Sequence, residues 1–158
     1  MSSEITYYQI MNSYTGKVVV PRTPEETVSP LCEVDANDPN YKPQAFNWQF
    51  IEIGQDLYRL VNQQTSLCVQ VKHGELPPEK DESVHQNTCV ADSDDEKWYF
   101  RNGRFECFLN PTLVWEPRNQ SKDPYTEIVV NTADQSPAQS WIRTAIAAEE
   151  AAAKGAGE

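Results

Sequence analysis

The side chains that most often perform catalysis or bind metals are few in this sequence, and their spacing specifies neither role. His73 and His85 are the two histidines, and neither lies in an HExxH motif or another arrangement typical of a metal ligand or a catalytic triad. The acidic run 92–96, DSDDE, supplies carboxylates, but a turn next to a strand usually carries them as solvated surface. The six glycines are scattered and form no phosphate-binding loop. We therefore expect no enzymatic activity, no bound metal and no cofactor.

The four cysteines leave two interpretations open. Cys32, Cys68, Cys89 and Cys107 contain no CxxC pair, so neither a zinc site nor thioredoxin-type chemistry is indicated. Cys68 and Cys89 could close a loop as a disulfide. In a reducing compartment all four would more simply be small, buried apolar side chains, and this is the interpretation that we favour.

The sequence segments that would position any functional site occur as repeats along the chain. The sequence around Asn62 matches the sequence around Asn12 at an offset of 50 residues. Trp98 follows Trp48 at the same offset. Because the two anchors are independent and agree on one period, they indicate two copies of one structural unit.

A third and shorter copy follows. Asn110 lies 48 residues after Asn62, and Trp141 lies 43 residues after Trp98, with a strand-like segment and a polar loop between them as before. The order of features is thus the same in every copy. We expect the three repeat tryptophans to meet in the core around a threefold axis, where the burial of each indole stabilises the fold by a few kcal/mol.

Short runs rich in Val, Ile, Tyr and Phe are separated by Pro, Gly, Asn and Asp, which is typical of an all-β barrel or sandwich. The expected strands number twelve, and they cover residues 7–12, 17–20, 31–34, 48–53, 58–62, 67–71, 84–88, 97–101, 106–110, 113–116, 128–131 and 140–144. Twelve strands in three fourfold copies predict a β-trefoil, which is a six-stranded barrel capped by three hairpins. Closure of the barrel removes exposed sheet edges.

The repeats define one domain, residues 4–146, followed by a tail, residues 147–158. Alanine and glutamate in the tail favour a helix, but the tail has no apolar face with which to dock, so we expect it to be flexible. A domain of this size can form its own core.

The formal charge of the chain is −11. Binding to nucleic acid or to an anionic membrane needs clustered Lys and Arg, so we expect neither partner. No apolar run is long enough to span a bilayer, and the N-terminus lacks the features of a secretory signal. We therefore expect a cytoplasmic protein, with secretion by a non-classical route as the alternative.

The ends of the copies resemble the ricin B-type lectin family, and above all its small intracellular fungal members. The QxW signature of that family stands as QSW at Gln139–Trp141, and in altered form as FNW at Phe46–Trp48 and EKW at Glu96–Trp98. The family's CLDV segment is matched by CVQV at Cys68–Val71, and Cys89 matches the partner cysteine of its disulfide. The resemblance covers about residues 5–144 and implies a β-trefoil that binds sugars.

In such lectins an Asp on the second strand accepts hydrogen bonds from sugar hydroxyls, an aromatic ring stacks on the sugar, and a polar residue before the Trp completes the set. Here the Asp position holds Val20, Gln70 and Glu116 in the three copies. No copy keeps the Asp, so the resemblance implies at most a non-standard glycan site, with glycans or glycoproteins as partners.

Two sets of residues are candidates for that site. Gln70, Asn87 and Asp95 form the most polar set, although they lack a stacking ring and could simply be polar barrel surface. The second set is Glu116 beside Trp115, with Tyr125 on the adjacent loop as a platform for the sugar. Trp115 could instead pack beneath the loop 117–127.

A different function is also consistent with the sequence. Small fungal β-trefoils that inhibit cysteine and serine proteases resemble this chain, and they present a rigid loop to the enzyme. Here Pro21, Arg22 and Thr23 lie in a proline-rich loop, whose restricted geometry would lower the entropy lost on docking. Arg22 would suit a trypsin-like pocket, although the same Pro-Arg pair recurs at Pro117 and Arg118.

The partner of the chain is thus a glycan or, alternatively, a protease. An unassigned binding role, including toxin-like defence, is a third interpretation. Small lectins often form symmetric dimers, and a homodimer is therefore a further alternative, although no segment marks an interface.

Overall fold

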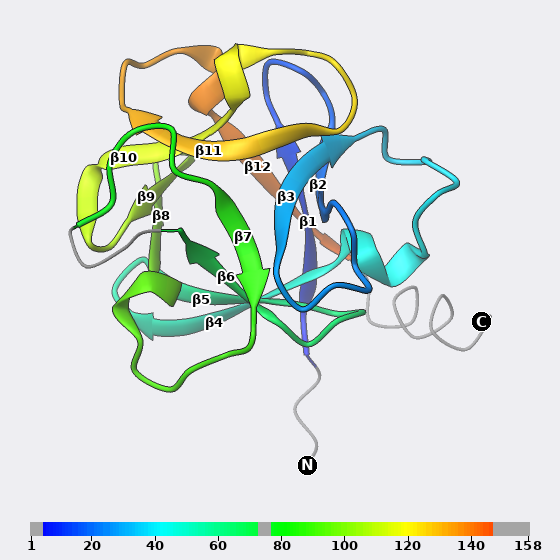
Figure 1. Cartoon of the computed structure of the whole chain (residues 1–158), viewed down its shortest axis with the longest axis horizontal. Coiled ribbons are helices and arrows are strands. Elements are labelled where there is room, and N and C mark those ends of the chain that lie inside the picture. The colour runs from blue at the N-terminus through cyan, green and yellow to red at the C-terminus, as the bar shows by residue number, and fades with distance from the viewer. Residues whose placement is uncertain (1–4, 73–76, 147–158) are drawn as a thin grey trace.

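A computed structural model describes residues 5–72 and 77–146 of the chain. Residue 4, His73 and the tail 147–158 lie outside the described residues. Figure 1 shows the fold. Its strands are β1 (Tyr7–Asn12), β2 (Val18–Pro21), β3 (Ser29–Val34), β4 (Trp48–Gly54), β5 (Leu57–Asn62), β6 (Cys68–Val71), β7 (Val84–Asn87), β8 (Trp98–Arg101), β9 (Arg104–Cys107), β10 (Asn110–Pro117), β11 (Thr126–Thr132) and β12 (Trp141–Ile146). Short 3₁₀ helices are η1 (Pro43–Phe46), η2 (Asp94–Glu96), η3 (Arg118–Gln120) and η4 (Pro137–Gln139).

Six of the strands form the barrel. Antiparallel pairing joins β12, β1, β4, β5, β8 and β9 in that order. The two ends of this series meet where the backbone N–H of Trp141 donates to the carbonyl of Gly103 at 2.7 Å. The other six strands form the hairpins β2–β3, β6–β7 and β10–β11. The predicted all-β β-trefoil is therefore confirmed.

The three hairpins are joined to one another as well as to the barrel. β3 pairs with β7, β11 pairs with β3, and Ser83 bridges to Val129, so that each hairpin contacts both of the others. Figure 1 shows β3, β7 and β11 as the sides of a triangle. Leu31, Val84 and Ile128 hold equivalent positions in the three hairpins and are all fully buried. Side chains on the outer face of this triangle can therefore come from all three copies.

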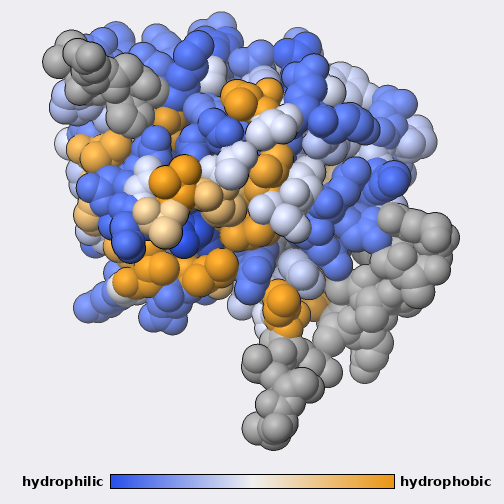
Figure 2. Space-filling view, turned by 60° about the horizontal axis from the view of Figure 1, so that its bottom comes forward, coloured by the Kyte–Doolittle hydropathy of each residue, from blue (hydrophilic) through white to orange (hydrophobic). Residues whose placement is uncertain are grey.

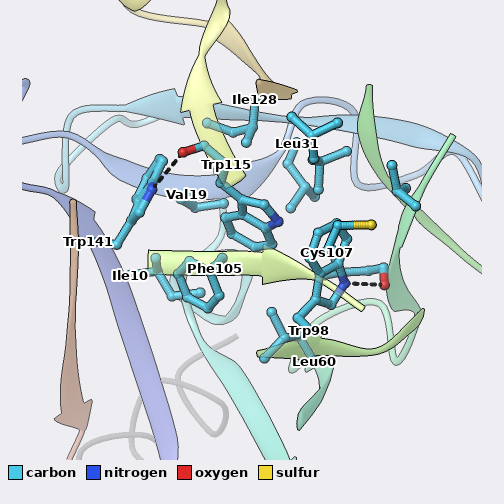
Figure 3. Close-up of a cluster of buried hydrophobic side chains, with 14 of the residues drawn as sticks. Ile10, Val19, Leu31, Leu60, Trp98, Phe105, Cys107, Trp115, Ile128 and Trp141 are labelled. Atoms are coloured by element: carbon cyan, nitrogen blue, oxygen red, sulfur yellow. Dashed lines mark hydrogen bonds between the residues drawn. The ribbon is translucent and has the colours of Figure 1, made fainter. Parts of the chain in front are cut away.

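The repeat tryptophans occupy equivalent positions, as predicted. Each begins the last strand of its copy and is buried. Each indole N–H donates to a main-chain carbonyl of its own copy at 3.0–3.1 Å, and the acceptors for Trp48, Trp98 and Trp141 are Val19, Val69 and Trp115. Figure 3 shows Trp115 between Trp98 and Trp141, and the Trp115 ring contacts both of them. These hydrogen bonds fix which residues of the three hairpins are equivalent.

The third copy does not use Asn110 as the sequence match suggested. Asn12 and Asn62 lie opposite repeat tryptophans in their ladders, and their side-chain oxygens accept hydrogen bonds from the turns that follow. In the third copy Cys107 lies opposite the tryptophan, so the correspondence with Asn110 is wrong by three residues. The cause is a short turn after β9, followed by a register shift in β10.

The end of the barrel away from the hairpins breaks the threefold pattern. Two sets of equivalent positions meet there, Tyr8 with Tyr58 and Gly103, and Phe50 with Phe100 and Arg143. The Arg143 guanidinium carbon lies 4.8, 4.9, 5.2 and 5.4 Å from the ring centroids of Tyr8, Phe50, Tyr58 and Phe100. The third copy therefore supplies an arginine where the others supply aromatic rings.

The face that Figure 2 presents is mostly hydrophilic, with some hydrophobic residues gathered near its centre. Among the described residues, the large apolar side chains that are exposed are Ile5, Tyr14, Val28, Ile53, Val90, Tyr125 and Ile142. Within residues 5–72 and 77–146 there is no helix with the length and apolar character needed to cross a bilayer.

Candidate ligand-binding site

Each hairpin contains one outward-facing residue directly after the carbonyl that binds the repeat tryptophan. A strand alternates its side chains between two faces, so this residue points away from the core. Its neighbour is the residue two positions before the tryptophan of the same copy. The three resulting pairs are Val20 with Phe46, Gln70 with Glu96, and Glu116 with Gln139.

The two polar pairs each combine one amide with one carboxylate, in opposite order. Gln70 Nε2 donates to Glu96 Oε2 at 2.8 Å, whereas Gln139 Nε2 donates to Glu116 Oε1 at 2.9 Å. The second copy therefore lacks an acid on its second strand because its acid, Glu96, stands two positions before the tryptophan instead. Burial of a carboxylate is tolerated in both copies because an amide donor faces it.

Further contacts hold the pair of the second copy in place. Gln70 Nε2 also donates to the carbonyl of Thr88 at 3.3 Å. Glu96 is fully buried, and its carboxylate accepts from the Val90 N–H at 2.7 Å and lies 3.3 Å from Arg59 Nε. Both amide hydrogens of Gln70 are thus used. Its Oε1 has no hydrogen-bond partner in the described part of the chain, which leaves this oxygen to accept from a ligand.

A disulfide fixes the segment that supplies these contacts. Cys68 and Cys89 are bonded, so the favoured interpretation of four free cysteines is wrong for this pair. Cys89 stands between Thr88 and Val90, and the bond therefore holds both of their backbone groups near Gln70 and Glu96. Cys32 and Cys107 are free and buried.

A pocket of about 430 Å³ opens over Gln70 on the outer face of β6–β7. The first candidate set, Gln70, Asn87 and Asp95, lines it. The remaining lining residues are Val71, Lys72, Ser83 and His85 from the same copy, and Val28, Pro30 and Glu127 from the other two. The structure therefore brings one predicted set together in a single concave site.

The polar groups in the pocket are directed by local hydrogen bonds. Asn87 Oδ1 accepts from the N–H of Thr88 at 2.7 Å, and Asn87 Nδ2 makes no hydrogen bond with any described residue. Asp95 accepts a hydrogen bond from the Ser93 hydroxyl. The pocket can thus offer a donor at Asn87 and an acceptor at Gln70 to one ligand.

The equivalent position of the third copy is closed. Glu116 accepts from Asn131 Nδ2 at 2.8 Å and from Gln120 Nε2 at 3.4 Å, in addition to Gln139. Glu116 is 2 % exposed, and η3 carries Gln120 beside it. Glu116 is therefore saturated by the amides of its own copy and has no open side for a ligand.

Trp115 and Tyr125 do not join Glu116 in a site. Trp115 is fully buried and stacks on Phe105 at 4.1 Å between ring centroids. It is inward-facing because it is equivalent to Val19 and Val69, so it cannot contact a sugar. The Tyr125 hydroxyl donates to Asp38 at 2.6 Å and thereby joins two loops. The second candidate set is thus separated into a core residue, a saturated acid and a loop contact.

The first copy has an apolar cluster in the equivalent place. Val20, Phe46 and Cys32 pack together there, and Tyr41 from the loop 35–43 lies against them. Burial raises the pKa of the Cys32 thiol to about 12, so this thiol stays protonated. The first copy therefore offers a ligand no polar pair.

The structure does not favour the inhibitory loop. Pro21 lies within β2 and is buried, and the Thr23 N–H donates to the Ser29 hydroxyl at 2.9 Å. Arg22 Nη1 pairs with Glu127 at 2.9 Å, and the Arg22 carbonyl accepts from the Tyr41 hydroxyl at the same distance. An inhibitor must present its arginine to a protease, whereas this side chain is already paired.

Sequence reasoning missed several residues of the pocket. His85 is the direct cross-strand neighbour of Gln70, so it could have been found once the register of the hairpin was known. Val28, Pro30 and Glu127 come from other copies and leave no local signal. In the described ranges, 5–72 and 77–146, no group of three or more His, Cys, Asp or Glu side chains is arranged to hold a metal ion.

No protein-family model and no curated protein matches the sequence. Solved structures do match. A designed threefold-symmetric protein, ThreeFoil, has a TM-score of 0.74 at 13% identity, over 87% of this chain and 97% of the other. The C-terminal half of an earthworm R-type lectin, solved with GalNAc, has a TM-score of 0.70 at 13% identity, over 89% and 99%.

An exo-β-1,3-galactanase from Clostridium thermocellum has a TM-score of 0.74 at 17% identity, over 89% of this chain but 30% of the enzyme. At these identities the similarity concerns the fold. The pairing of the strands and the solved structures agree, and the chain is a β-trefoil protein of three unequal copies.

Proposed function

We propose that this protein is a non-catalytic carbohydrate-binding module, or lectin, whose glycan site is the pocket of the second copy. The observation that carries the proposal is that Gln70, Asn87 and Asp95 line one pocket at the outer face of a hairpin. Two structural neighbours support it, since the earthworm lectin was solved with GalNAc and, as a mutant, with 6'-sialyllactose.

The chemistry of the pocket suits a sugar ring. Sugar hydroxyls both donate and accept, and the pocket has an acceptor at Gln70 and a donor at Asn87. The apolar C–H face of a sugar needs an apolar wall, which Val28 and Pro30 supply in place of an aromatic ring. Because no Phe, Tyr or Trp is among the described residues that line the pocket, we expect a dissociation constant on the order of 1 mM for a single sugar residue.

A glycan array tests the proposal. The wild-type protein should bind a defined subset of glycans, and Asn87→Ala should weaken that binding at least tenfold because it removes the free donor. Gln55→Ala is the control, since Gln55 is an exposed amide in the turn between β4 and β5, and it should bind as the wild type does.

The outcome can contradict the proposal in two ways. A blank array for the wild-type protein would reject carbohydrate binding. Unchanged binding by Asn87→Ala, with binding otherwise specific, would show that the glycan site lies elsewhere on the protein.

A further inference from the structure

The pocket continues beyond the second copy, onto the meeting point of the three hairpins. Pro30, Ser83 and Glu127 all line it, and they hold equivalent positions in the three copies. Each stands one residue before a buried side chain at the centre of the hairpin triangle. One end of the pocket therefore lies over Gln70 and Asn87, and the other lies at the pseudo-threefold axis.

The two ends are too far apart for one sugar ring. Gln70 pairs with His85 on β7, and His85 pairs with Pro30 on β3. Neighbouring strands are about 4.8 Å apart, so Gln70 and Pro30 are separated by about 10 Å across the sheet. A ligand that contacts both ends needs a second residue.

Glu127 gives the axial end a fixed acceptor. Its carboxylate lies 2.9 Å from Arg22 Nη1 and 3.7 Å from Arg118 Nη2, and its side chain is 28 % exposed. The two guanidinium groups orient the carboxylate and leave room for further hydrogen bonds to its oxygens. Hydrogen bonds to an ionised acceptor are stronger than neutral ones, so sugar hydroxyls would be suitable donors here.

The axial end also has an apolar side. Val28 is 55 % exposed, although it is an aliphatic residue, and Pro30 lies beside it. The structure otherwise buries most of its valines in the core. A pyranose ring can pack its apolar C–H face against the aliphatic wall and donate hydrogen bonds from its hydroxyl groups to the neighbouring carboxylate.

The net charge of the whole chain disfavours an anionic ligand. Near the pocket the charges are mixed: Asp95 and Glu127 line it together with Lys72 and His85, and Arg22 and Arg118 lie beside Glu127. The chain as a whole carries a charge of −11, which repels anionic glycans as they approach.

From these contacts we infer that the pocket binds a neutral glycan of at least two sugar residues. The first residue occupies the Gln70 and Asn87 end, and the second lies against Val28 and Glu127 at the axis. The inference rests on the proposed function, because it concerns the same pocket.

The test is an array of neutral and sialylated mono-, di- and trisaccharides, followed by titration of the best neutral disaccharide and of its terminal monosaccharide. The wild-type protein should bind the disaccharide at least tenfold more tightly. Glu127→Gln and Val28→Ser should each reduce this ratio at least threefold and leave monosaccharide binding unchanged. Glu52→Gln removes an exposed carboxylate on β4 and serves as the control, which should keep the ratio.

The outcomes separate this inference from the proposed function. Asn87→Ala should weaken the monosaccharide and the disaccharide alike, because it alters the end that they share. An axial subsite is ruled out by equal affinities for the two ligands or by an unchanged ratio in both axial variants. A preference for sialylated glycans contradicts the inference that the ligand is neutral. A wild-type protein that binds nothing on the array contradicts the proposed function itself. Thermal melting of each variant confirms that it is folded.

Discussion

Glu33 is a buried carboxyl group in a position where the second copy has Gln86. Both residues lie opposite the strand residue whose carbonyl binds the repeat indole. Each accepts a hydrogen bond from a threonine hydroxyl, Thr15 at 2.8 Å and Thr65 at 3.0 Å. Gln86 also donates to the Glu26 carbonyl at 2.7 Å, whereas Glu33 Oε2 has no partner among the described residues. Burial therefore raises the pKa of Glu33 to about 7, from a usual value of 4.5.

This pKa predicts how stability changes with pH. Between pH 4.5 and 7 the native state holds a proton on Glu33 that the unfolded chain has lost. The free energy of unfolding should therefore fall as the pH rises through this range, by about 3 kcal/mol, and become level above it. Glu33→Gln should remove this part of the pH dependence and be more stable than the wild type at pH 8.

Urea denaturation between pH 4.5 and 8 measures the effect. Glu52→Gln, which changes an exposed carboxylate, is the control for the general effect of charge. If the wild type and Glu33→Gln follow the same pH curve, the carboxyl group of Glu33 is not the source of the dependence.

At the scale of the element, the hairpin β6–β7 differs from the other two hairpins by its disulfide. Cys68 lies in β6, and Cys89 follows β7 by two residues, so the bond closes a loop with a sequence separation of 21. The bond joins the strand that carries Gln70 to the segment that hydrogen-bonds Gln70 and Glu96. Hairpin stability and pocket geometry are thus coupled in this copy.

Loss of the disulfide should lower the stability of the protein and weaken its pocket. The double variant Cys68→Ala, Cys89→Ala should lose about 3 kcal/mol of unfolding free energy, because a loop of this length is no longer closed in the unfolded chain. Glycan binding should fall as well, since the backbone of Thr88 and Val90 is then less restrained.

Urea denaturation with and without dithiothreitol measures the effect on stability. The reductant should lower the denaturation midpoint of the wild type and leave that of the double variant unchanged. A wild-type protein insensitive to the reductant would mean that the bond contributes nothing to stability.

At the scale of the whole molecule, the sequence was sufficient to predict the fold but only part of the site, namely Gln70, Asn87 and Asp95. Trp48 and Trp98 keep a constant offset, and this predicted the threefold barrel. Trp115 was wrongly included in a candidate sugar site. The sequence of a strand shows that its side chains alternate between two faces, but it does not show which face points into the core. That depends on which residue accepts the hydrogen bond of the repeat indole, and this residue is Trp115 itself. Glu127 was missed because its contact with the pocket arises from the pairing of separate hairpins, which no local pattern encodes.

The departure from threefold symmetry at the barrel end gives a prediction for the whole fold. Gly103 stands where the other copies have Tyr8 and Tyr58, and a Cβ at Gly103 would approach the Trp141 carbonyl to 3.3 Å. The missing ring leaves space that the Arg143 side chain occupies. Its guanidinium carbon is within 5.4 Å of four ring centroids, so its charge lies against aromatic surface.

Arg143→Ala should therefore uncover this end of the barrel and lower the free energy of unfolding by about 1–3 kcal/mol. Arg143→Phe, which restores the residue type of Phe50 and Phe100, should retain more stability than Arg143→Ala. Arg101→Ala is the matched control, because Arg101 lies over one ring and its exposed ion pair with Glu106 contributes about 1 kcal/mol or less. Urea denaturation of the wild type and the three variants measures these losses. If Arg143→Ala and Arg101→Ala lose the same unfolding free energy, Arg143 is an ordinary surface residue, and the aromatic rings close the barrel without it.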